Sequence, residues 1–463
     1  MRSTHLLFTV FTVSLLYILA MGNMGCGQIG FPTGGARDTI APRLVSASPK
    51  LNSTNVTSNK ITLTFDEYVE VKEAQTNVVI SPFPKKNPSV DFKLKTVTVK
   101  LKDSLIPNTT YSINFGNAIV DNNEGNPFKD FTYVFSTGNI IDSFKLEGKV
   151  VIAETGKSDS TLIALLYRNA DDSAVQKRKP DYVAKLSGNG SFIFINLPAG
   201  NFKVYALKDG DGGKTYNSKK EVFAFADAAV TVSAKTEPVI LFASALEKET
   251  GPAPAAKPKI PAKRLTYFLA PGAQFQDLLN PFEVTFNNPL KVFDASRLIL
   301  RDTNYKPIPS TIWSIDSSRT KITLTNNWQQ ATEYRLIMDT LAFSDSANNH
   351  LAKTDTIRFI TKQQSDYGNV VLRFSNLDLT RRPVLQFVQG EEIKKSYPIT
   401  TLEWRNKFIN PGEYDIRILY DANNNGKWDP GDYSKKLQPE KAITLTLKLG
   451  VRANWDNERD IKL

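Results

Sequence analysis

The sequence predicts an all-β chain of tandem β-sandwiches behind an N-terminal export signal. Short runs in which apolar and polar residues alternate recur along the chain, for example at 60–65, 97–101 and 111–115. Such alternation is typical of half-buried strands, and many short runs separated by turn residues indicate β-sandwiches. The order of motifs in the first half also recurs in the second half. These observations predict two copies of a pair of sandwich domains.

The first 26 residues indicate that the protein is exported. Arg2 precedes an apolar run from Leu6 to Met21, and small residues lead up to Cys26, the only cysteine of the chain. A basic start, a short apolar stretch and a small residue before the cut are typical of a signal peptide. The run is also shorter than the ~20 residues that a membrane-spanning helix needs. The alternatives are an uncleaved membrane helix and an ordinary signal followed by a free, reactive cysteine.

This signal resembles those of bacterial lipoproteins. Asn23 stands where such signals usually have an aliphatic residue, a departure that resembles the looser signals of Bacteroidetes-type bacteria. The resemblance implies cleavage between Gly25 and Cys26 and attachment of acyl chains, palmitate among them, to the new N-terminal cysteine. The mature protein would then be anchored by lipid in the cell outer membrane, facing either the periplasm or the exterior.

Composition restricts the classes of function. The chain after the signal is long enough for three or four domains of roughly 100–150 residues, and a hydrophobic content of 41% suits ordinary globular cores. The two histidines are His5 and His350, which leaves no room for a multi-histidine zinc site and argues against a serine–histidine triad. No nucleophile motif or phosphate-binding loop stands out, so the sequence predicts that the protein is not an enzyme.

The formal net charge of the chain is +11, which indicates anionic partners. For an exported protein these are lipid headgroups, lipopolysaccharide or acidic glycans, and no nucleic acid is expected. The basic residues occur in short, scattered groups such as 85–86, 177–179 and 394–395. An ordinary solvated surface therefore remains the alternative to a dedicated anion site.

Residues 39–138 predict the first sandwich. Its alternating strands are accompanied by Ala-Pro-Arg-Leu-Val-Ser-Ala-Ser-Pro at 41–49, Pro-Asn-Thr-Thr-Tyr at 107–111 and Asp-Asn-Asn-Glu-Gly-Asn at 121–126. These motifs resemble bacterial Ig-like domains of the surface-layer-protein type. The resemblance implies a fold but no activity, because such domains serve as spacers, adhesins and enzyme accessories.

Residues 139–246 predict a smaller sandwich. A strand, a Pro-Ala-Gly turn at 198–200 and a second alternating strand follow one another in its middle. This arrangement resembles transthyretin-like, carboxypeptidase-regulatory-like modules, which implies a stabilising or binding role. The next segment, 247–264, is rich in Pro, Ala and Lys and is typical of a semi-rigid linker, whereas the Gly-rich segment 26–38 is typical of a flexible tether.

The second half of the chain repeats the first. Phe-Glu-Val-Thr-Phe at 282–286 parallels the strand that ends at Phe65, and residues 411–421 align with 199–209 without a gap. The predicted boundaries are the signal peptide 1–25, the tether 26–38, Ig-like domain 1 at 39–138, sandwich 1 at 139–246, the linker 247–264, Ig-like domain 2 at 265–363 and sandwich 2 at 364–463.

Residues 421–432 match the spacing of a calcium-binding loop, which has oxygen ligands at positions 1, 3, 5, 7, 9 and 12 and glycine at position 6. The predicted ligands are Asp421, Asn423, Asn425, the Lys427 carbonyl, Asp429 and Asp432. A strand precedes the loop and Asp closes it, so it resembles the loops of dockerins and extracellular β-modules. Two neutral amides predict a modest affinity for Ca²⁺, ~10⁻⁴–10⁻³ M. A plain Asn/Gly turn between strands is the alternative.

The corresponding loop of the first half lacks this pattern. Its positions 5 and 6 are Gly213 and Lys214, and its position 12 is Lys220. No metal is expected there.

Asp followed by Ser or Thr and then a small or aliphatic residue recurs along the chain. The tripeptide resembles the O-glycosylation acceptor of Bacteroidetes periplasmic proteins, although ordinary turn-to-strand junctions give the same pattern. The candidate acceptors are Thr39, Ser104, Ser160, Ser173, Thr340, Ser346 and Thr356.

Taken with the anchor, the sandwiches predict a non-catalytic envelope protein that acts as a scaffold or accessory subunit of an outer-membrane protein complex. The alternative is a glycan-binding or adhesive cell-surface protein, in which exposed tryptophans stack on sugars. Such tryptophans more often belong to protein cores. The candidates are Trp313, Trp328, Trp404, Trp428 and Trp455.

Overall fold

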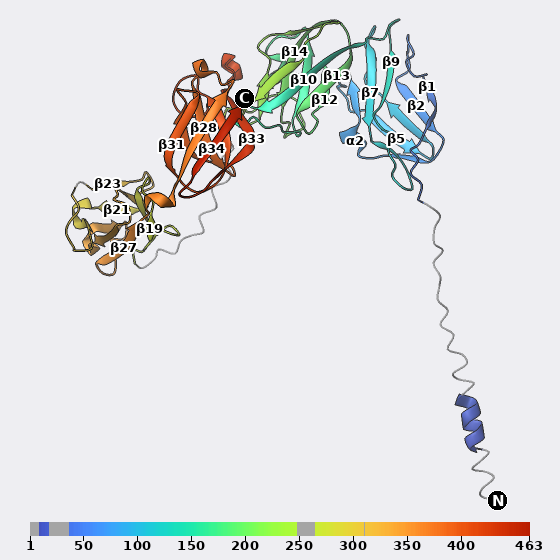
Figure 1. Ribbon diagram of the computed structural model, residues 1–463. Coiled ribbons are helices and arrows are strands. Elements are labelled where there is room, and N and C mark those ends of the chain that lie inside the picture. The colour runs from blue at the N-terminus through green and yellow to red at the C-terminus, as the bar shows by residue number, and fades with distance from the viewer. Residues whose placement is uncertain (1–8, 18–36, 248–263, 310) are drawn as a thin grey trace, which may run out of the picture. The chain divides into compact units, whose positions relative to one another are not determined.

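The computed structural model describes residues 9–17, 37–247, 264–309 and 311–463. Apart from helical residues 9–17 and the short helices α2 (Ala74–Asn77) and α3 (Ala174–Lys177), the described chain consists of strands, turns and brief 3₁₀ segments. This confirms the predicted all-β fold (Figure 1). No helix in the described ranges is long and apolar enough to cross a membrane. Cys26 and almost all of the predicted linker lie outside the described residues.

The described chain divides into two compact units. The first comprises the residues up to Val78, Lys86–Ile106 and Ile113–Phe135, and the second comprises Val79–Lys85, Pro107–Ser112 and Ser136–Leu463.

Ig-like domain 1 contains sheets ordered β1-β2-β6-β5 and β4-β7-β9 and the pair β3-β8. The period-two pattern of the sequence appears directly in β2, where Ile61, Leu63 and Phe65 are buried and the residues between them are not, because successive side chains point to opposite faces of a sheet. The strands are β1 (Leu44–Ser48), β2 (Lys60–Phe65), β3 (Val69–Val71), β4 (Val79–Ser81), β5 (Ser89–Lys93), β6 (Thr96–Lys100), β7 (Thr110–Gly116), β8 (Ile119–Asp121) and β9 (Phe131–Ser136).

Sandwich 1 packs the sheet β13-β10-β17 against the sheet β12-β11-β14-β15, with β16 also paired to β14. Its core joins Leu146 and Phe192 of the first sheet to Leu166 and Phe202 of the second. The strands are β10 (Phe144–Ile152), β11 (Ile163–Arg168), β12 (Tyr182–Lys185), β13 (Ser191–Leu197), β14 (Gly200–Leu207), β15 (Phe223–Phe225), β16 (Val230–Val232) and β17 (Val239–Ala243).

Ig-like domain 2 has sheets ordered β18-β20-β24-β23 and β19-β27-β25-β22 and the pair β21-β26. Its core includes Phe282 and Ile322 from the first sheet and Leu336 and Phe359 from the second. The elements are β18 (Tyr267–Phe268), β19 (Phe275–Gln276), β20 (Phe282–Phe286), β21 (Leu290–Phe293), η1 (Ala295–Arg297), β22 (Leu298–Arg301), β23 (Ile312–Ile315), β24 (Lys321–Thr325), β25 (Glu333–Met338), η2 (Thr340–Ala342), β26 (Phe343–Asp345) and β27 (Asp355–Thr361).

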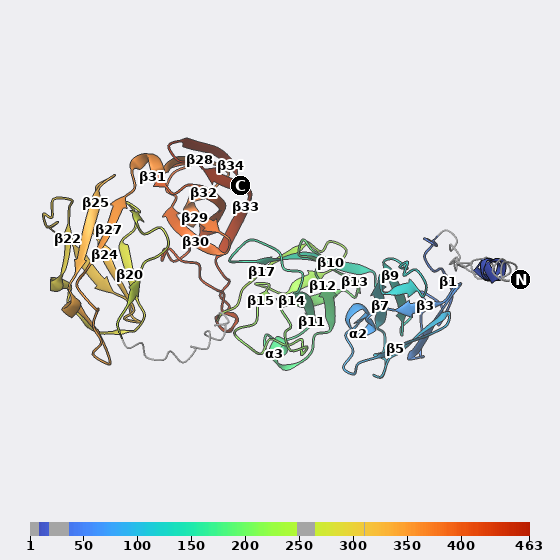
Figure 2. The ribbon, with the colours of Figure 1, turned by 90° about the horizontal axis from the view of Figure 1, so that it is seen from below.

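Sandwich 2, whose strands are visible in Figure 2, has sheets ordered β31-β28-β34 and β30-β29-β32-β33. Leu372 and Trp404 from the first sheet meet Phe387 and Ile416 from the second in its core. The elements are η3 (Gln364–Asp366), β28 (Gly368–Ser375), η4 (Leu379–Arg381), β29 (Pro383–Gln389), β30 (Glu392–Pro398), β31 (Glu403–Ile409), β32 (Gly412–Tyr420), η5 (Tyr433–Lys435), β33 (Lys441–Val451) and β34 (Asp456–Lys462).

The topology confirms the predicted duplication. Both sandwiches contain a three-stranded sheet in which one pair is parallel, β10 with β17 and β28 with β34. A parallel pair among otherwise antiparallel neighbours needs a long crossover, so its recurrence at the same place in both copies is a specific mark of a shared fold. The first sheets of the two Ig-like domains also have equivalent strand orders.

Each Ig-like domain ends one strand pair with a buried aspartate that organises a turn. The Asp121 carboxylate accepts the backbone N–H groups of residues 123–126 at 2.6–3.0 Å. In domain 2, Asp345 accepts the N–H groups of Ala347 and Asn349 and the side-chain amides of Asn349 and Asn288. Burial alone would raise the pKa of each carboxyl, but these donors outweigh burial and hold both pKa values below their ordinary range.

Candidate functional site: the loop between β32 and β33

The predicted calcium loop connects β32 to β33. Asp421, 1% exposed, follows the last residue of β32. Its carboxylate accepts the N–H groups of Asn425 at 3.2 Å and Gly426 at 2.7 Å. Asn424 and Gly426 have φ values of 61° and 73°, a region that Asn and Gly tolerate and most other residues avoid. The first predicted ligand therefore folds the loop back over the end of its strand.

The structure gathers most of the predicted ligands into this turn. The side-chain amides of Asn423 and Asn425 donate to the same Asp429 carboxylate oxygen, at 2.6 and 2.7 Å. The Lys427 backbone N–H donates to the Asn425 side-chain oxygen at 2.7 Å. The amide groups now act as donors, and a bound cation would require them to turn their oxygens inward.

Asp432 has other partners. Its carboxylate accepts the N–H of Ser434 at 3.0 Å and the hydroxyl of the same residue at 2.6 Å, and it pairs with Lys435 at 3.3 Å. The Ser434 hydroxyl bond leads the effects that lower the pKa of Asp432. This acid thus caps η5, at the C-terminal end of the loop that Asp421 begins.

Glu440, which the sequence prediction did not include, joins the turn instead. Its carboxylate accepts the N–H groups of Ala422 at 2.7 Å and Asp429 at 3.1 Å. Burial raises the pKa of Glu440, the two N–H donors oppose that effect, and the nearby carboxylates of Asp421 and Asp429 add to it. Glu440 lies beyond the twelve-residue template, so spacing could not reveal it.

The oxygen atoms of this turn come from side-chain amides, backbone carbonyls and carboxylates. Among the residues that the structure describes, no group of three or more His, Cys, Asp or Glu side chains is arranged to hold a metal ion. The calcium prediction consequently depends on amide and carbonyl oxygens as well as carboxylates, and it stays a prediction.

The equivalent loop of sandwich 1 contains an internal cation. The Lys214 ammonium lies 3.1 Å from the Asp209 carboxylate, which occupies the position of Asp421, and the Lys214 N–H also donates to it. Asp211 accepts from Asn217 at 2.8 Å. In sandwich 1 the first carboxylate of the loop, Asp209, pairs with a lysine. In sandwich 2 the equivalent carboxylate, Asp421, accepts the N–H groups of Asn425 and Gly426.

The second part of the loop docks onto sandwich 1. Tyr433, 7% exposed, inserts among Tyr205, Tyr216, Phe223 and Phe225, which we call the aromatic socket. Its ring meets those of Phe225 and Phe223 edge-on, with centroids 5.1 and 5.2 Å apart. Its hydroxyl donates to the Asp172 carbonyl at 2.6 Å and lies 2.9 Å from the Tyr205 hydroxyl. The buried phenol is thereby satisfied, and burial raises its pKa well above the ordinary value.

Polar contacts surround the aromatic socket. The Gln438 side-chain amide donates to the Phe225 carbonyl at 3.0 Å and to Asp227 at 2.7 Å. Lys436 pairs with Asp172 at 3.1 Å. A buried aromatic anchor with a polar rim is the usual composition of a specific protein interface.

The edge strand of sandwich 2 is also covered by sandwich 1. The Ala442 N–H donates to the Ala153 carbonyl at 2.8 Å, and the Thr444 hydroxyl donates to the Thr155 carbonyl. Gly156 has a φ of +69°, and a Cβ there would lie 2.8 Å from the Ala442 carbonyl oxygen. Glycine is therefore required for this approach, which shields an edge that would otherwise offer free backbone groups.

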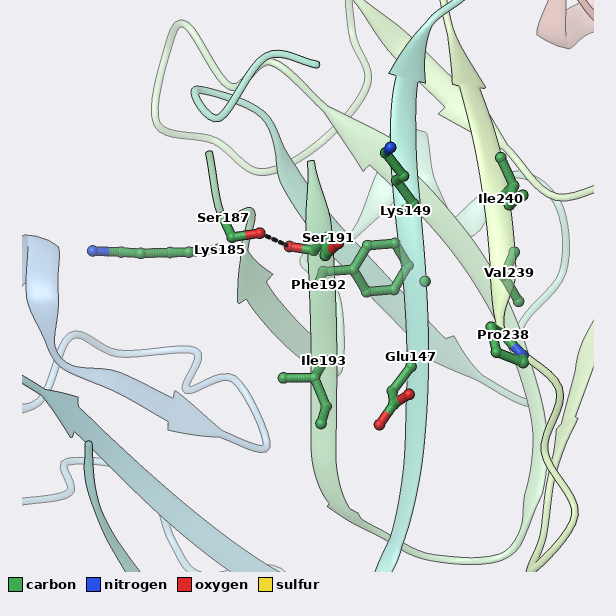
Figure 3. A pocket seen from close by; sticks show the side chains of 11 residues that line it. Glu147, Lys149, Lys185, Ser187, Ser191, Phe192, Ile193, Pro238, Val239 and Ile240 are labelled. Atoms are coloured by element: carbon green, nitrogen blue, oxygen red, sulfur yellow. Dashed lines mark hydrogen bonds between the residues drawn. The ribbon is translucent and has the colours of Figure 1, made fainter. Parts of the chain in front are cut away.

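The equivalent three-stranded sheets differ on their outer faces. In sandwich 1 an open hollow of about 550 Å³ lies beside Gly148, with Ile193 and Ile240 exposed at its sides (Figure 3). In sandwich 2 the corresponding face has an ion-pair ladder, in which Arg373 contacts Glu403 at 3.1 Å and Glu458 at 2.7 Å.

The other candidate residues have different surroundings. Of the tryptophans, Trp328 and Trp404 are 8% and 9% exposed and belong to cores, whereas Trp455 is 60% exposed. Among the candidate glycosylation acceptors, Ser173 and Thr340 are half-buried and the others are exposed. Several of the preceding aspartates accept the N–H two residues on, which is the turn chemistry of the alternative interpretation: Asp38, Asp159, Asp339 and Asp345.

Comparison with known proteins identifies the Ig-like segments. Residues 38–137 and 266–361 match a family model described as a bacterial Ig-like domain. The chain therefore contains two bacterial Ig-like domains, as the motifs predicted. No curated protein matches the chain.

Solved structures with weak similarity include native alpha-2-macroglobulin from Escherichia coli spanning domains MG0-NIE-MG1, with 11% identity, a TM-score of 0.21 and coverage of 40% of this chain and 72% of that one. The N-terminal part of the bacterial S-layer protein SbsC has 17% identity, a TM-score of 0.16 and coverage of 45% of each chain. BcpA, the major pilin subunit of Bacillus cereus, has 9% identity, a TM-score of 0.18 and coverage of 69% and 99%. Scores this low carry no argument about function.

Proposed function

We propose that this protein is a non-catalytic, lipid-anchored scaffold of the cell envelope and an accessory subunit of an outer-membrane protein complex. The observation that carries the proposal is the docking of sandwich 2 on sandwich 1 through Tyr433. A scaffold must hold its modules in fixed positions, and a buried aromatic anchor with hydrogen-bonded surroundings supplies such a fixed contact. The two segments that match a bacterial Ig-like domain suit a spacer within such a scaffold.

The proposed anchor is acylated Cys26. Acyl chains partition into a bilayer with about 0.8 kcal/mol per buried methylene group, so several chains on one cysteine would hold the protein firmly at the membrane. The formal net charge of +11 adds attraction to anionic headgroups.

Anchoring and partnership can be tested separately in cells of the native host. We expect a clickable palmitate analogue to label the wild-type chain in the outer-membrane fraction, and we expect Cys26→Ser to abolish labelling and release the protein from that fraction. Absence of label on the wild-type chain would refute lipid anchoring. Protease treatment of intact cells then reports which face of the membrane the protein occupies.

The scaffold role makes its own prediction. After solubilisation in mild detergent, the wild-type chain should migrate on a native gel within a complex that contains an integral outer-membrane protein at fixed stoichiometry. Tyr433→Ala, which removes the docking anchor, should shift that complex, whereas Tyr68→Ala at an exposed position should not. Migration of the wild-type chain as a lone monomer would contradict the proposal.

Glycan binding is the second candidate. The observation that favours it is a cavity lined by aromatic side chains at the junction of Ig-like domain 2 and sandwich 2. Tryptophan does not line this cavity, so the recognition chemistry differs from the one that the sequence suggested.

A further inference from the structure

A cavity of about 260 Å³ opens between Ig-like domain 2 and sandwich 2. The rings of Phe387, Tyr397, Phe408 and Tyr414 line it together with the side chains of Lys394 and Lys395, and no Asp or Glu does. Its volume is close to the lower end of small-molecule sites, which favour domain junctions and combine apolar walls with a few polar groups.

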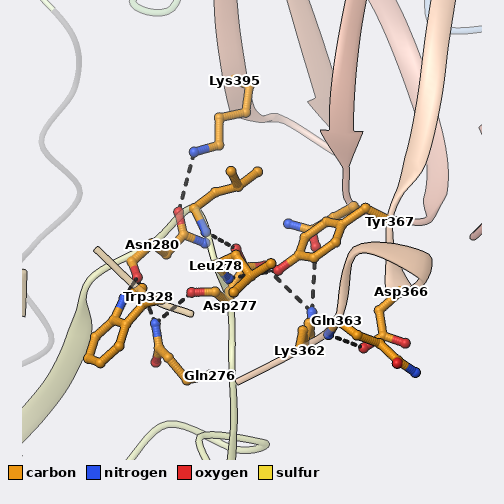
Figure 4. Close-up of polar contacts among 12 residues, drawn as sticks. Gln276, Asp277, Leu278, Asn280, Trp328, Lys362, Gln363, Asp366, Tyr367 and Lys395 are labelled. Atoms are coloured by element: carbon orange, nitrogen blue, oxygen red, sulfur yellow. Dashed lines mark hydrogen bonds and ion pairs between the residues drawn. The ribbon is translucent and has the colours of Figure 1, made fainter. Parts of the chain in front are cut away.

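Polar contacts connect the two modules beside this cavity (Figure 4). The Tyr367 hydroxyl accepts the Leu278 N–H at 2.7 Å. Lys362 lies 3.5 Å from both Asp277 and the Asn410 side-chain oxygen. Lys395 donates across the junction to the Asn280 side-chain oxygen at 3.3 Å. Both modules line the cavity, because Leu279 and Asn280 of Ig-like domain 2 meet residues of sandwich 2 there.

Phe408 is held in an unfavourable backbone conformation. Its φ is +60°, and the residue at the same place in sandwich 1, Asn196, has a φ of +56°. Both stand four residues before the glycine that begins the next strand, Gly412 or Gly200. Asn tolerates the left-handed region better than most residues because its side chain is short and polar, and here the Asn196 amide also donates to the Asp142 carbonyl at 3.0 Å. A bulky ring has no such compensation and is an outlier there.

The two copies share the backbone conformation at this position but differ in the side chain. The fold needs a positive φ at this position in both copies, and Asn meets the need at a lower energy than Phe. Strained residues of this kind cluster at functional sites, so the ring of Phe408 is a candidate for a role of its own. The ring faces that of Tyr367 edge-on, with centroids 5.9 Å apart, at the wall of the cavity.

We propose that this cavity binds an acidic sugar, with the pyranose ring of a hexuronic acid packed against Phe408 and Tyr397 and its carboxylate near Lys394 and Lys395. The apolar C–H face of a pyranose suits an aromatic wall, and its hydroxyls suit the amides of Asn280 and Asn410, which also line the cavity. Lys394 already pairs with Glu392 at the mouth of this site, and Lys395 donates to the Asn280 side-chain oxygen. The sugar carboxylate would therefore displace the exposed Glu392 carboxylate from Lys394 and add a bond to Lys395. This inference does not depend on the scaffold role.

Trp404 provides a reporter, because its ring lies 5.1 Å from that of Tyr397. The full chain is titrated with oligogalacturonate, with neutral galactose oligomers of the same length and with inorganic phosphate, followed by Trp fluorescence and calorimetry. We expect saturable binding of the acidic oligomer and binding at least about tenfold weaker for the neutral one, a difference of ~1.4 kcal/mol. Equal competition by inorganic phosphate would reduce the cavity to a simple anion site and overturn the proposal.

Variants separate ligand binding from packing. Phe408→Asn installs the residue that sandwich 1 has at this position, so we expect a melting temperature at or above that of the wild type together with loss of sugar binding. The double variant Lys394→Gln, Lys395→Gln should bind acidic and neutral oligomers equally weakly. Lys407→Gln, at an exposed position on β31, which belongs to the other sheet, is the matched control and should bind as the wild type does. Absence of saturable binding of oligogalacturonate, or unchanged binding in both test variants, would refute the sugar site.

Discussion

The hydroxyl oxygens of Tyr205 and Tyr433 lie 2.9 Å apart, although 228 residues separate the two tyrosines along the chain. The contact joins sandwiches that are not consecutive, since Ig-like domain 2 lies between them in sequence. The segment that contains the predicted calcium loop therefore also connects the C-terminal half of the chain to the N-terminal half. Each half therefore contributes to the stability of the other.

Removal of the anchor ring should separate the halves. With a specific protease site inserted into the 247–264 linker, we expect the cut wild-type halves to elute together on size exclusion. Tyr433→Ala deletes a ring that fills the aromatic socket and should weaken the association by ~2–4 kcal/mol, so that the halves elute apart. Tyr433→Phe keeps the ring and loses only the hydroxyl bonds, and an effect as large as that of Ala would contradict the packing argument.

A pair of glycines tests the covered edge of β33. Gly156 and Gly212 have φ values of +69° and +76°, but a Cβ meets the Ala442 carbonyl at 2.8 Å only at Gly156, while nothing lies within 4 Å at Gly212. Both Ala variants should lose ~1 kcal/mol from backbone strain. Gly156→Ala should in addition weaken the association of the cut halves, and identical behaviour of the two variants would show that the edge contact is dispensable.

Acid should destabilise Ig-like domain 1 through Asp121. The pKa of this carboxyl is lower in the folded chain than in the unfolded chain. Its stabilisation is therefore full above the unfolded pKa, ordinarily ~3.9, and is lost as the pH falls through the lower folded pKa. Asp121→Asn should cost ~1–3 kcal/mol in urea unfolding at pH 7 and lessen the loss of stability below pH ~4. Asp91→Asn, at an exposed strand position, should leave the profile unchanged.

Substitutions of Glu440 and Asp432 should affect calcium binding differently. If the turn binds Ca²⁺ with a dissociation constant of ~1 mM, 10 mM Ca²⁺ should stabilise the protein by ~1.4 kcal/mol relative to EDTA. Glu440→Gln, which alters the carboxylate that accepts from Ala422 and Asp429, should abolish this gain. Asp432→Asn should retain it, because that carboxylate caps Ser434. Equal melting in Ca²⁺ and EDTA for the wild type would refute the metal site.

Much of the fold could be predicted because its causes are local. The alternation of apolar and polar residues at 60–65 is sufficient to predict a strand with one buried face. The match of residues 411–421 with 199–209 corresponds in the structure to the equivalent strands β32 and β14. Asp421 and its turn follow from short-range hydrogen bonds to Asn425 and Gly426.

The rest depends on contacts that leave no local signal. Tyr433 lies in a polar loop, and nothing in its neighbours indicates a partner on sandwich 1. Glu440, the residue before β33, reaches the turn only because the loop folds back. Phe408 and Asn196 stand at the same distance before Gly412 and Gly200, but only the structure shows that both have a positive φ.

The aromatic socket has a consequence for folding. Domains generally fold as units, so sandwich 1 can fold before sandwich 2 does. The last strand of sandwich 1 ends at Ala243, but the aromatic socket is filled only when Tyr433 inserts. Until Tyr433 docks, a folded sandwich 1 presents the rings of Tyr205, Phe223 and Phe225 to water. During that interval the exposed rings make the partly folded chain prone to aggregation.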